Sequence, residues 1–402
     1  MKMANKKVVI TGAEAAAAAM KQINPEVVAA YPITPQTPII QKFSQYVADG
    51  EVDTEFVLVE SEHSAMSATV GAASAGVRAM TCTASQGLAL MHEIIPVASG
   101  LRLPIVMSVA NRALSAPINI HCDHSDSMAA RDHSWIQLYT ENPQEVYETT
   151  LLAIRLAEHP DIQLPVMVCQ DGFINSHCSK NVTLFDNSIV KKFLGKYKPR
   201  INLLDTDNPI TVGPLALFDY YFEMKYQQSK AMKLVPKVFL DVGKELSKIT
   251  NNKYNFFEEY KLKDAKYAII VLSSTAGTGK EVVNQLRAKG KKVGLLKIKM
   301  FRPFPYKKIA KALSHLKKAA VLDRAESFGA DAPLYSEIKN SLYHTKKRPI
   351  LQSYIYGLGG RDTQEKDIQD LFEELMNLKC DEDSARYLAC RTGDPNVCKI
   401  KK

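Results

Sequence analysis

Five polar residues in the first third of the chain are of the types that bind and activate small anionic substrates. Each lies just beyond a strand-like run: Thr34, Glu62, Ser85, Gln86 and Arg112. In an open parallel sheet, ligands bind beyond the carboxyl ends of the strands. One rim of such a sheet would therefore gather a hydroxyl, a carboxylate, a glycine turn and a guanidinium. This combination suits a small anionic substrate beside a second group that needs a carboxylate.

Each of these residues also has a purely structural alternative. Thr34 could cap the helix that begins at Pro35, because a capping residue followed by proline is a common helix start. Glu62 lies in the first turn of a predicted helix, where the macrodipole favours a carboxylate. Arg112 could pair with an acid at the surface. Capping does not explain an arginine at the same rim, so the residues taken together favour a functional site.

Two other segments imitate known binding motifs. Residues 121–126 read His-Cys-Asp-His-Ser-Asp, but a metal site needs at least three converging ligands and consecutive loop residues cannot all face one point. We expect a polar loop at the edge of the pocket there, and no metal site. Gly277-Thr278-Gly279-Lys280 resembles the end of a phosphate-binding loop, but Glu281 stands where that motif needs Ser or Thr. We expect a tight turn between a strand and a helix, and no nucleotide.

Alternating strand and helix patterns position the candidate residues. Strands are predicted at 8–11, 27–31, 56–59, 79–83, 104–110 and 166–169, and helices at 13–23, 36–47 and 63–75. This alternation is typical of a parallel sheet with helices on both faces. A second set begins near residue 266, with strands at 268–272, 293–298, 319–322 and 350–355. It predicts a smaller doubly wound domain.

The fold class that follows is α/β, with two doubly wound, mostly parallel sheet domains. The first domain is expected over 1–185 and the second over 259–376, followed by a polar tail over 377–402 that contains three of the cysteines. Residues 186–258 show weak periodicity and are expected to form an irregular connector or an arm that wraps a partner. A structureless stretch of that length is unusual in a compact domain, so some elements are expected to be hidden there.

Composition narrows the class of protein. With 402 residues and 46% hydrophobic content, the chain can form two domains with a core each. No apolar run approaches the ~20 residues that span a bilayer, and the start does not resemble a signal peptide, so we expect a cytoplasmic protein with no membrane contact. The net charge of +9 comes with little aromatic interleaving, which favours a solvated surface or a subunit contact over nucleic acid. Seven scattered cysteines without a CxxC pair encode neither a zinc ribbon nor an iron–sulfur cluster.

Taken together, the motifs resemble those of the pyruvate:ferredoxin oxidoreductase family, within the 2-oxoacid:ferredoxin oxidoreductases. The resemblance covers nearly the whole chain in the expected order. Its motifs are Tyr31-Pro32-Ile33-Thr34-Pro35, Ser61-Glu62, Thr83-Ala84-Ser85-Gln86-Gly87, Asn111-Arg112, Asp123-His124, Asp171-Gly172-Phe173, Phe301-Arg302-Pro303-Phe304-Pro305, Val321-Leu322-Asp323-Arg324 and Gly357-Leu358-Gly359-Gly360-Arg361-Asp362. Length and domain order resemble the α subunit of the multi-subunit form. The first domain is similar to the pyrimidine-binding domain of thiamine enzymes, and the second to the transketolase C-terminal domain.

The resemblance implies an enzyme divided among several chains. It would convert pyruvate and coenzyme A to acetyl-CoA and CO2, or run in reverse, with electrons passing to ferredoxin. Thiamine diphosphate would be shared with a β subunit that holds the diphosphate and Mg²⁺, in keeping with the lack of a GDG sequence here. The 4Fe-4S clusters would lie on other subunits, such as γ and δ subunits or their equivalents. Other 2-oxoacids (2-oxobutyrate, 2-oxoglutarate or branched-chain acids) stay open, and so does a non-catalytic module that binds a nucleotide or a partner.

The resemblance also assigns roles residue by residue. Glu62 matches the cofactor glutamate, whose carboxyl would hydrogen-bond N1′ of the aminopyrimidine. Thr34 and Arg112 match the positions that hold the substrate carboxylate. Ile120 matches an apolar residue beside the substrate methyl group. Ser85 and Gln86, which the motifs place at the same rim, are expected to bind the cofactor.

Overall fold

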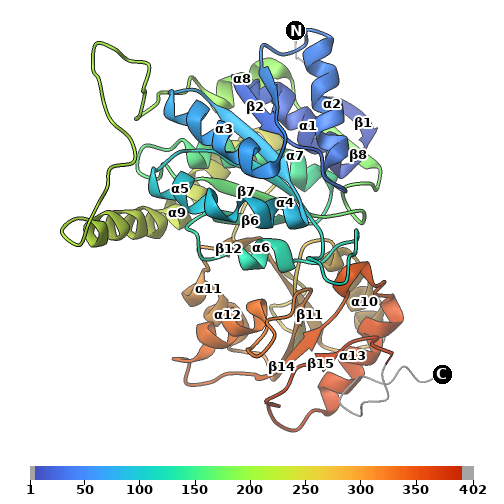
Figure 1. The fold of residues 1–402 in the computed structure, drawn as a ribbon. Helices are drawn as coiled ribbons and strands as arrows, with labels where there is room; N and C mark the ends of the chain where they lie inside the picture. Colours follow the sequence, from blue (N-terminus) through green and yellow to red (C-terminus); the bar gives the residue numbers. More distant parts are fainter. Residues whose placement is uncertain (1–4, 392–402) are drawn as a thin grey trace.

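The computed structural model describes residues 5–391, and its elements form an upper and a lower part (Figure 1). The upper part, coloured blue to green, contains a seven-stranded sheet. The lower part, coloured yellow-brown to red, contains a six-stranded sheet. A separate pair of strands completes the described sheets. The two-domain α/β architecture predicted from the sequence is confirmed.

The seven-stranded sheet has the order β12-β6-β7-β5-β4-β2-β3. Six strands are parallel: β2 (Val27–Ala30), β3 (Glu55–Leu58), β4 (Ala79–Thr83), β5 (Val106–Asn111), β6 (Ile136–Thr140) and β7 (Val166–Asp171). The central strands β4, β5 and β7 are buried along their whole length, as expected for a parallel sheet covered on both faces. The edge strand β12 (Met300–Arg302) comes from the second half of the chain and pairs antiparallel with β6.

Helices cover this sheet. They are α1 (Gly12–Ile23), α2 (Thr37–Ala48), α3 (Glu62–Ser74), α4 (Ser85–Leu90), α5 (Ile95–Gly100), α6 (Ser125–Ala129) and α7 (Pro143–Ala157), with a 3-10 turn at Met91–Glu93. Local sequence explains where several begin. Thr11 caps α1 in a capping box with Glu14, and Asn142 caps α7 ahead of a proline at its first position. The buried alanines of α1 have little bulk, which lets this helix pack closely within the core.

The strand at the start of the chain is placed differently from the prediction. β1 (Lys6–Ile10) does not join the parallel sheet but pairs antiparallel with β8 (Lys180–Leu184). The expectation that the run at 8–11 begins the parallel sheet is therefore wrong. Val9 is 69% exposed, whereas a strand inside a parallel sheet is buried on both faces. The sequence pattern does not predict strand β6, because Gln137 and Thr140 interrupt its apolar run.

The second sheet has the order β15-β14-β13-β10-β11-β9. Its strands are β9 (Phe257–Tyr260), β10 (Tyr267–Leu272), β11 (Val293–Ile298), β13 (Lys318–Asp323), β14 (Ile350–Ile355) and β15 (Arg386–Tyr387); the helices are α10 (Thr275–Ala288), α11 (Tyr306–Leu313), α12 (Pro333–Leu342) and α13 (Glu365–Asn377), with a 3-10 turn at Leu358–Gly360. The four predicted strands form its parallel centre.

Gly277–Lys280 lies inside α10, so the turn expected there is wrong. A Cβ on Gly279 would lie 2.6 Å from Leu295 Cδ1, so this glycine allows close packing of helix on sheet.

The connector expected over 186–258 contains two helices, α8 (Asn187–Leu194) and α9 (Tyr221–Thr250). Residues 195–220 and 251–256 of this range have no helix or strand, and the two helices are elements of the kind expected to be hidden there. Helix α9 has 30 residues, and its second half buries Val235, Val238, Val242 and Leu246 at helical spacing. Its first half projects away from the body of the molecule (Figure 1). Lysines and an internal proline weaken this pattern in the sequence.

One hydrophobic cluster runs through both domains. At their boundary Phe301 packs between Tyr139 and Phe304, at ring-centroid distances of 6.1 and 5.8 Å. The part of the tail described here, up to residue 391, adds β15 to the second sheet; Cys398 lies outside the described residues. Among residues 5–391 no helix is both long enough and apolar enough to cross a bilayer. The domain boundaries proposed above stay predictions.

Candidate functional site

Glu62 lies at the rim where β3 ends, as the first residue of α3. Ser61 caps this helix by accepting a hydrogen bond from the Ser64 amide at 3.2 Å. Glu62 is only 7% exposed. Among residues 5–391 its carboxyl has no hydrogen-bond or ion-pair partner. A buried carboxyl without a partner is costly, so this position fits a group that binds from outside the chain.

Gly87, in the first turn of α4, lies against this carboxyl. A Cβ at position 87 would come within 2.8 Å of Glu62 Oε1 and 2.4 Å of Thr83 Oγ1. The Thr83 hydroxyl is buried and has no hydrogen-bond partner among the described residues. The Thr83-Ala84-Ser85-Gln86-Gly87 motif therefore ends on the one residue type that leaves the Glu62 carboxyl undisturbed.

Arg112 follows β5 and is 7% exposed. Its Nε donates to the carbonyl oxygen of Asn119 at 2.8 Å, and its Nη1 donates to the carbonyl oxygen of Thr34 at 2.9 Å. Its Nη2 has no hydrogen-bond partner in the described part of the chain. The two bonds fix the plane of the guanidinium and bring Thr34 and Arg112 together, as the sequence predicts. The contact is through the backbone of Thr34, and the Thr34 residue itself is exposed.

The carboxylate of Asp126 joins the ends of β4 and β5. It accepts hydrogen bonds from the amides of Ser85 at 2.9 Å and Arg112 at 3.0 Å, and from Asn111 Nδ2 at 2.8 Å. Burial raises the pKa of Asp126, although these hydrogen bonds oppose the shift. In the sequence, Asp126 stands out only as one member of a ligand-rich run. Its role depends on contacts 14 and 41 residues away, for which the sequence carries no local signal.

Three predicted site residues remain: Ser85, Gln86 and Ile120. Ser85 is buried with a left-handed φ of 46°, and its hydroxyl donates to the Ala113 carbonyl at 2.6 Å. The same hydroxyl lies 2.6 Å from Gln86 Oε1, so both side chains brace the turn between β4 and α4. Ile120 lies beside Asn119 in the loop after Arg112 and is 43% exposed. The cofactor role of Ser85 and Gln86 and the substrate role of Ile120 stay predictions.

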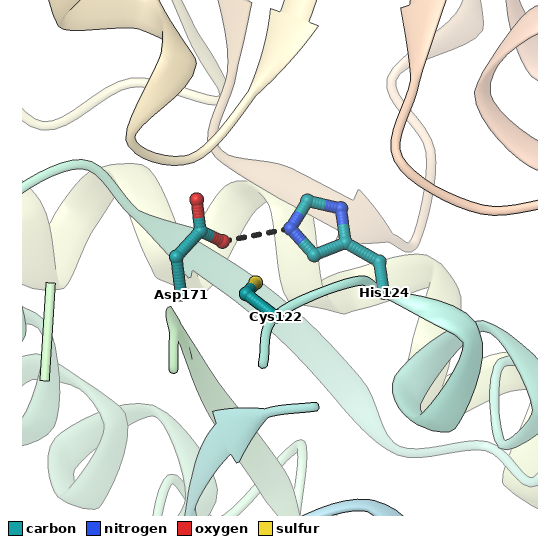
Figure 2. A group of neighbouring side chains, drawn as sticks. All are labelled: Cys122, His124 and Asp171. Atoms are coloured by element: carbon teal, nitrogen blue, oxygen red, sulfur yellow. Dashed lines mark hydrogen bonds and ion pairs between the residues drawn. The ribbon is translucent and has the colours of Figure 1, made fainter. Parts of the chain in front are cut away.

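A second cluster lies between the two domains, and Figure 2 shows its three members from the first domain, Cys122, His124 and Asp171. Their potential ligand atoms all lie within 4.8 Å of one another, and His124 Nε2 is 2.8 Å from Asp171 Oδ1. Arg324, which follows β13, brings Nη1 to 3.1 Å from Asp171 Oδ2 and 3.8 Å from Cys122 Sγ. This guanidinium supplies the positive charge that a metal ion would bring, so the geometry favours an internal ion pair.

The electrostatics of this cluster agree with an ion pair. Burial alone would raise the pKa of Asp171, but Arg324 and His124 outweigh it and hold that pKa well below its usual range. The Ser274 amide also donates to Asp171 Oδ2, at 3.2 Å. The polar loop expected at the edge of the pocket is buried at Cys122, Asp123, His124 and Asp126 and exposed at His121, and its buried part contacts the second domain. The sequence of residues 121–126 could not show this, because the partners Asp171 and Arg324 lie far away in the chain.

Comparison with known proteins identifies the family. Residues 18–244 match the model of the pyruvate flavodoxin/ferredoxin oxidoreductase thiamine-diphosphate-binding domain, and residues 265–368 match that of pyruvate:ferredoxin oxidoreductase core domain II. The chain is 57% identical to pyruvate synthase subunit PorA of Thermotoga maritima, covering 96% of this chain and 98% of that one. It is 46% identical to PorA of Methanocaldococcus jannaschii, covering 95% and 98%. It is 43% identical to ketoisovalerate oxidoreductase subunit VorA of Pyrococcus abyssi, covering 92% and 94%.

Solved structures support the fold. The chain is similar to the 2-oxoglutarate:ferredoxin oxidoreductase of Magnetococcus marinus, solved with 2-oxoglutarate, coenzyme A and succinyl-CoA bound, with a TM-score of 0.72 and 19% identity. That match covers 92% of this chain and 65% of the other. A split-gene transketolase in an inactive β4 tetramer matches with a TM-score of 0.53 and 12% identity, covering 92% of this chain. From these matches and the motifs, the chain belongs to the pyruvate:ferredoxin oxidoreductase family and is a subunit of an oxidoreductase.

Proposed function

We propose that this chain is the α subunit of a pyruvate:ferredoxin oxidoreductase. The complex converts pyruvate and coenzyme A to acetyl-CoA and CO2, or runs in reverse, and passes electrons to ferredoxin. The observation that carries the proposal is the buried Glu62 carboxyl, which has no partner among residues 5–391 and shares a rim with Arg112. Pyruvate is favoured over other 2-oxoacids because relatives at 57% and 46% identity are named pyruvate synthase subunits.

Glu62 binds the aminopyrimidine of thiamine diphosphate in this proposal. Its carboxyl hydrogen-bonds N1′ and holds a proton there, which favours the tautomer whose 4′-nitrogen can accept the C2 proton. When bound, the cofactor supplies a nucleophilic carbon and an electron sink for the decarboxylation of a 2-oxoacid. Gly87 is part of this arrangement because any side chain at position 87 would press on Glu62 Oε1.

Arg112 holds the substrate carboxylate. A guanidinium is suited to this task because it forms charge-assisted hydrogen bonds in a fixed plane. Two of its nitrogens are already bonded to the carbonyls of Asn119 and Thr34, which orients the third toward a ligand. Thr34 borders the same substrate position, and Ile120 contacts the substrate methyl group. Ser85 and Gln86 support the cofactor from the turn that precedes α4.

Other chains complete the enzyme in this proposal. A β subunit holds the diphosphate and Mg²⁺, and 4Fe-4S clusters on γ and δ subunits, or their equivalents, carry the electrons. The sequence of 402 residues supports this division because it contains neither a GDG sequence nor a CxxC pair. The isolated chain should therefore bind thiamine diphosphate weakly and show no turnover. Full activity of the purified chain alone would contradict the subunit assignment.

The most direct test replaces Glu62 with Gln in the assembled complex. Glu62→Gln should slow hydrogen–deuterium exchange at C2 of the bound cofactor by about 10²- to 10⁴-fold, the usual contribution of a positioned acid–base group. NMR of acid-quenched samples measures this exchange. Glu60→Gln is the matched control, because Glu60 is exposed and lies two residues away. Wild-type exchange in Glu62→Gln would refute the role of Glu62.

A branched-chain 2-oxoacid is the second candidate substrate, because the ketoisovalerate oxidoreductase relative is 43% identical. The native complex should be assayed with pyruvate, 2-oxobutyrate, 2-oxoglutarate and 2-oxoisovalerate, with ferredoxin as acceptor. The proposal expects the highest kcat/KM for pyruvate. A higher kcat/KM for 2-oxoisovalerate would replace pyruvate while leaving the roles of Glu62 and Arg112 in place.

A further inference from the structure

The loop that follows Arg112 is bonded to the second domain through two consecutive glycines. We call residues 113–124 the substrate loop. The carbonyl oxygen of Gly359 accepts a hydrogen bond from Asn119 Nδ2 at 3.0 Å, and the Gly360 amide donates to the Cys122 carbonyl at 2.6 Å. The Gly359 amide also donates to Asp123 Oδ2 at 3.2 Å. The position of the substrate loop therefore depends on the second domain.

Asn119 transmits this contact to Arg112. Its side chain binds Gly359, while its backbone carbonyl accepts the hydrogen bond from Arg112 Nε at 2.8 Å. The Oδ1 atom of Asn119 also accepts a hydrogen bond from the amide of His121 at 2.7 Å, which fixes the side chain within the loop. A shift of the Asn119 backbone would consequently rotate the plane of the guanidinium.

Only glycines allow so close an approach. Gly359 has φ of 59° and Gly360 has φ of 75°, both in the left-handed region that glycine adopts without a Cβ clash. A Cβ at position 359 would lie 2.4 Å from Asn119 Nδ2, and one at position 360 would lie 2.3 Å from His121 Cβ. The His124 amide donates to the Arg324 carbonyl at 2.7 Å, so the second domain holds the second half of the loop, from Asn119 to His124.

We propose that Gly359 and Asn119 are positioning residues through which the second domain orients the Arg112 guanidinium toward the substrate carboxylate. This inference rests on the proposed role of Arg112 in binding that carboxylate. It gives the second domain a part in substrate binding although none of its residues need touch the substrate. A misplacement of about 1 Å at a reacting or binding group can change rates by about 10²-fold, so an indirect contact of this kind has a measurable effect.

The test introduces Gly359→Ala in the assembled complex. The KM for pyruvate should rise about tenfold, within the range that such misplacement produces, while kcat changes by less than about twofold. Gly290→Ala is the matched control. Gly290 has a left-handed φ of 75°, as Gly360 does, but nothing lies within 4 Å of its added Cβ. Both variants carry the strain of a left-handed alanine, and only Gly359→Ala presses on the substrate loop.

A readout other than turnover separates positioning from general damage. Amide hydrogen exchange over residues 113–124 should be faster in Gly359→Ala than in the wild type, and unchanged in Gly290→Ala. If Gly359→Ala does not assemble, Asn119→Ala removes only the side-chain bonds to Gly359 and His121. It should raise the KM for pyruvate by about three- to tenfold, with the same faster exchange.

A double-variant cycle distinguishes this inference from the proposed function. In an Arg112→Ala background, Gly359→Ala should cause no further rise in KM, because the group that it misplaces is already absent. If Arg112→Ala alone leaves KM unchanged, the carboxylate role of Arg112 fails. If Arg112→Ala raises KM while Gly359→Ala matches Gly290→Ala in KM and in loop exchange, the positioning role is overturned.

Discussion

Two ionic clusters cross the same boundary between the domains, and each brings a cation of the second domain to carboxylates of the first. The Arg324 cluster consists of Arg324, Asp171, His124 and Cys122. The Lys297 cluster consists of Lys297, Glu141, Glu145, Glu258 and their neighbours Lys280 and Lys299. In the first, the side chains of the ion pair are 4% and 0% exposed. In the second, Lys297 is 2% exposed but Glu258 is 36% exposed.

The clusters also differ in what they are connected to. Lys297 Nζ lies 2.9 Å from Glu145 Oε1, in the first turn of α7, and 2.7 Å from Glu258 Oε2 on β9, and it also pairs with Glu141. None of these residues belongs to the substrate loop. Arg324 binds Asp171 with its side chain and the His124 amide with its carbonyl. We infer that the Lys297 cluster only holds the domains together, whereas the Arg324 cluster also positions the site.

Removing the buried guanidinium should have the largest effect. Arg324→Met leaves Asp171 buried without its main counter-charge, and breaking such a pair costs about 3–5 kcal/mol. The free energy of unfolding should fall by that amount in urea denaturation of the chain. The KM for pyruvate should also rise in the assembled complex, because the substrate loop loses part of its support.

Arg324→Lys keeps the charge but cannot bind Asp171, Thr275 and Cys122 together, so it should be intermediate. A loss below about 1 kcal/mol for Arg324→Met would contradict the ion pair.

Lys297→Met should destabilise the chain less. It leaves three carboxylates near one another, but Lys280 still pairs with Glu141 and Glu258, and Lys299 still pairs with Glu145. The acids also keep partial contact with water, so the cost should be about 2 kcal/mol, below the range for fully buried pairs. The KM for pyruvate should not change in the assembled complex. A rise in KM equal to that of Arg324→Met would remove the distinction between the two clusters.

The sequence predicts those parts of the site that are local. Thr34, Glu62, Ser85 and Arg112 each follow a strand of the same sheet, and the topology of parallel sheets brings such positions to one rim. The partners that fix them are remote. Asn119 and Gly359 are 240 residues apart, and no periodicity or spacing in the chain could link them.

The errors in the fold have physical causes of the same kind. β1 has the composition of a strand, but pairing with β8 rather than with the parallel sheet is decided by tertiary contacts. In α9 the buried positions are correctly spaced for a helix, yet Pro236 lowers its local helix preference and the many lysines dilute its apolar pattern. Packing of its apolar face on the core stabilises this helix, and local propensity contributes little.

Lowering the pH should have a smaller effect on stability than either variant, and it tests the same difference between the two clusters. Burial alone would raise the pKa of Glu145, but Lys299 and Lys297 outweigh it and lower that pKa to about 2; the pKa of Asp171 is also held well below its usual range. A carboxyl whose folded pKa is depressed stabilises the fold above its unfolded pKa of roughly 4, and this contribution is lost as pH falls toward the folded value. The contribution of Glu145 and Asp171 to the free energy of unfolding should therefore decrease from about pH 5 toward pH 2.

The two variants should alter this acid dependence unequally. Lys297→Met leaves Lys299 at 2.8 Å from Glu145, so much of the depressed pKa should survive. Arg324→Met leaves Asp171 with His124 and Ser274 as polar partners, so its pKa should return toward the ordinary value. A carboxyl with a depressed pKa takes up a proton on unfolding, which contributes up to about 1.4 kcal/mol per pH unit to the slope of the free energy of unfolding against pH. A carboxyl whose pKa has returned to the ordinary value no longer makes this contribution. Urea denaturation at several pH values between 5 and 3 should therefore show a flatter dependence for Arg324→Met than for Lys297→Met. Equal slopes would mean that the carboxylates of both clusters depend equally on a single cation, which the geometry of the Lys297 cluster argues against.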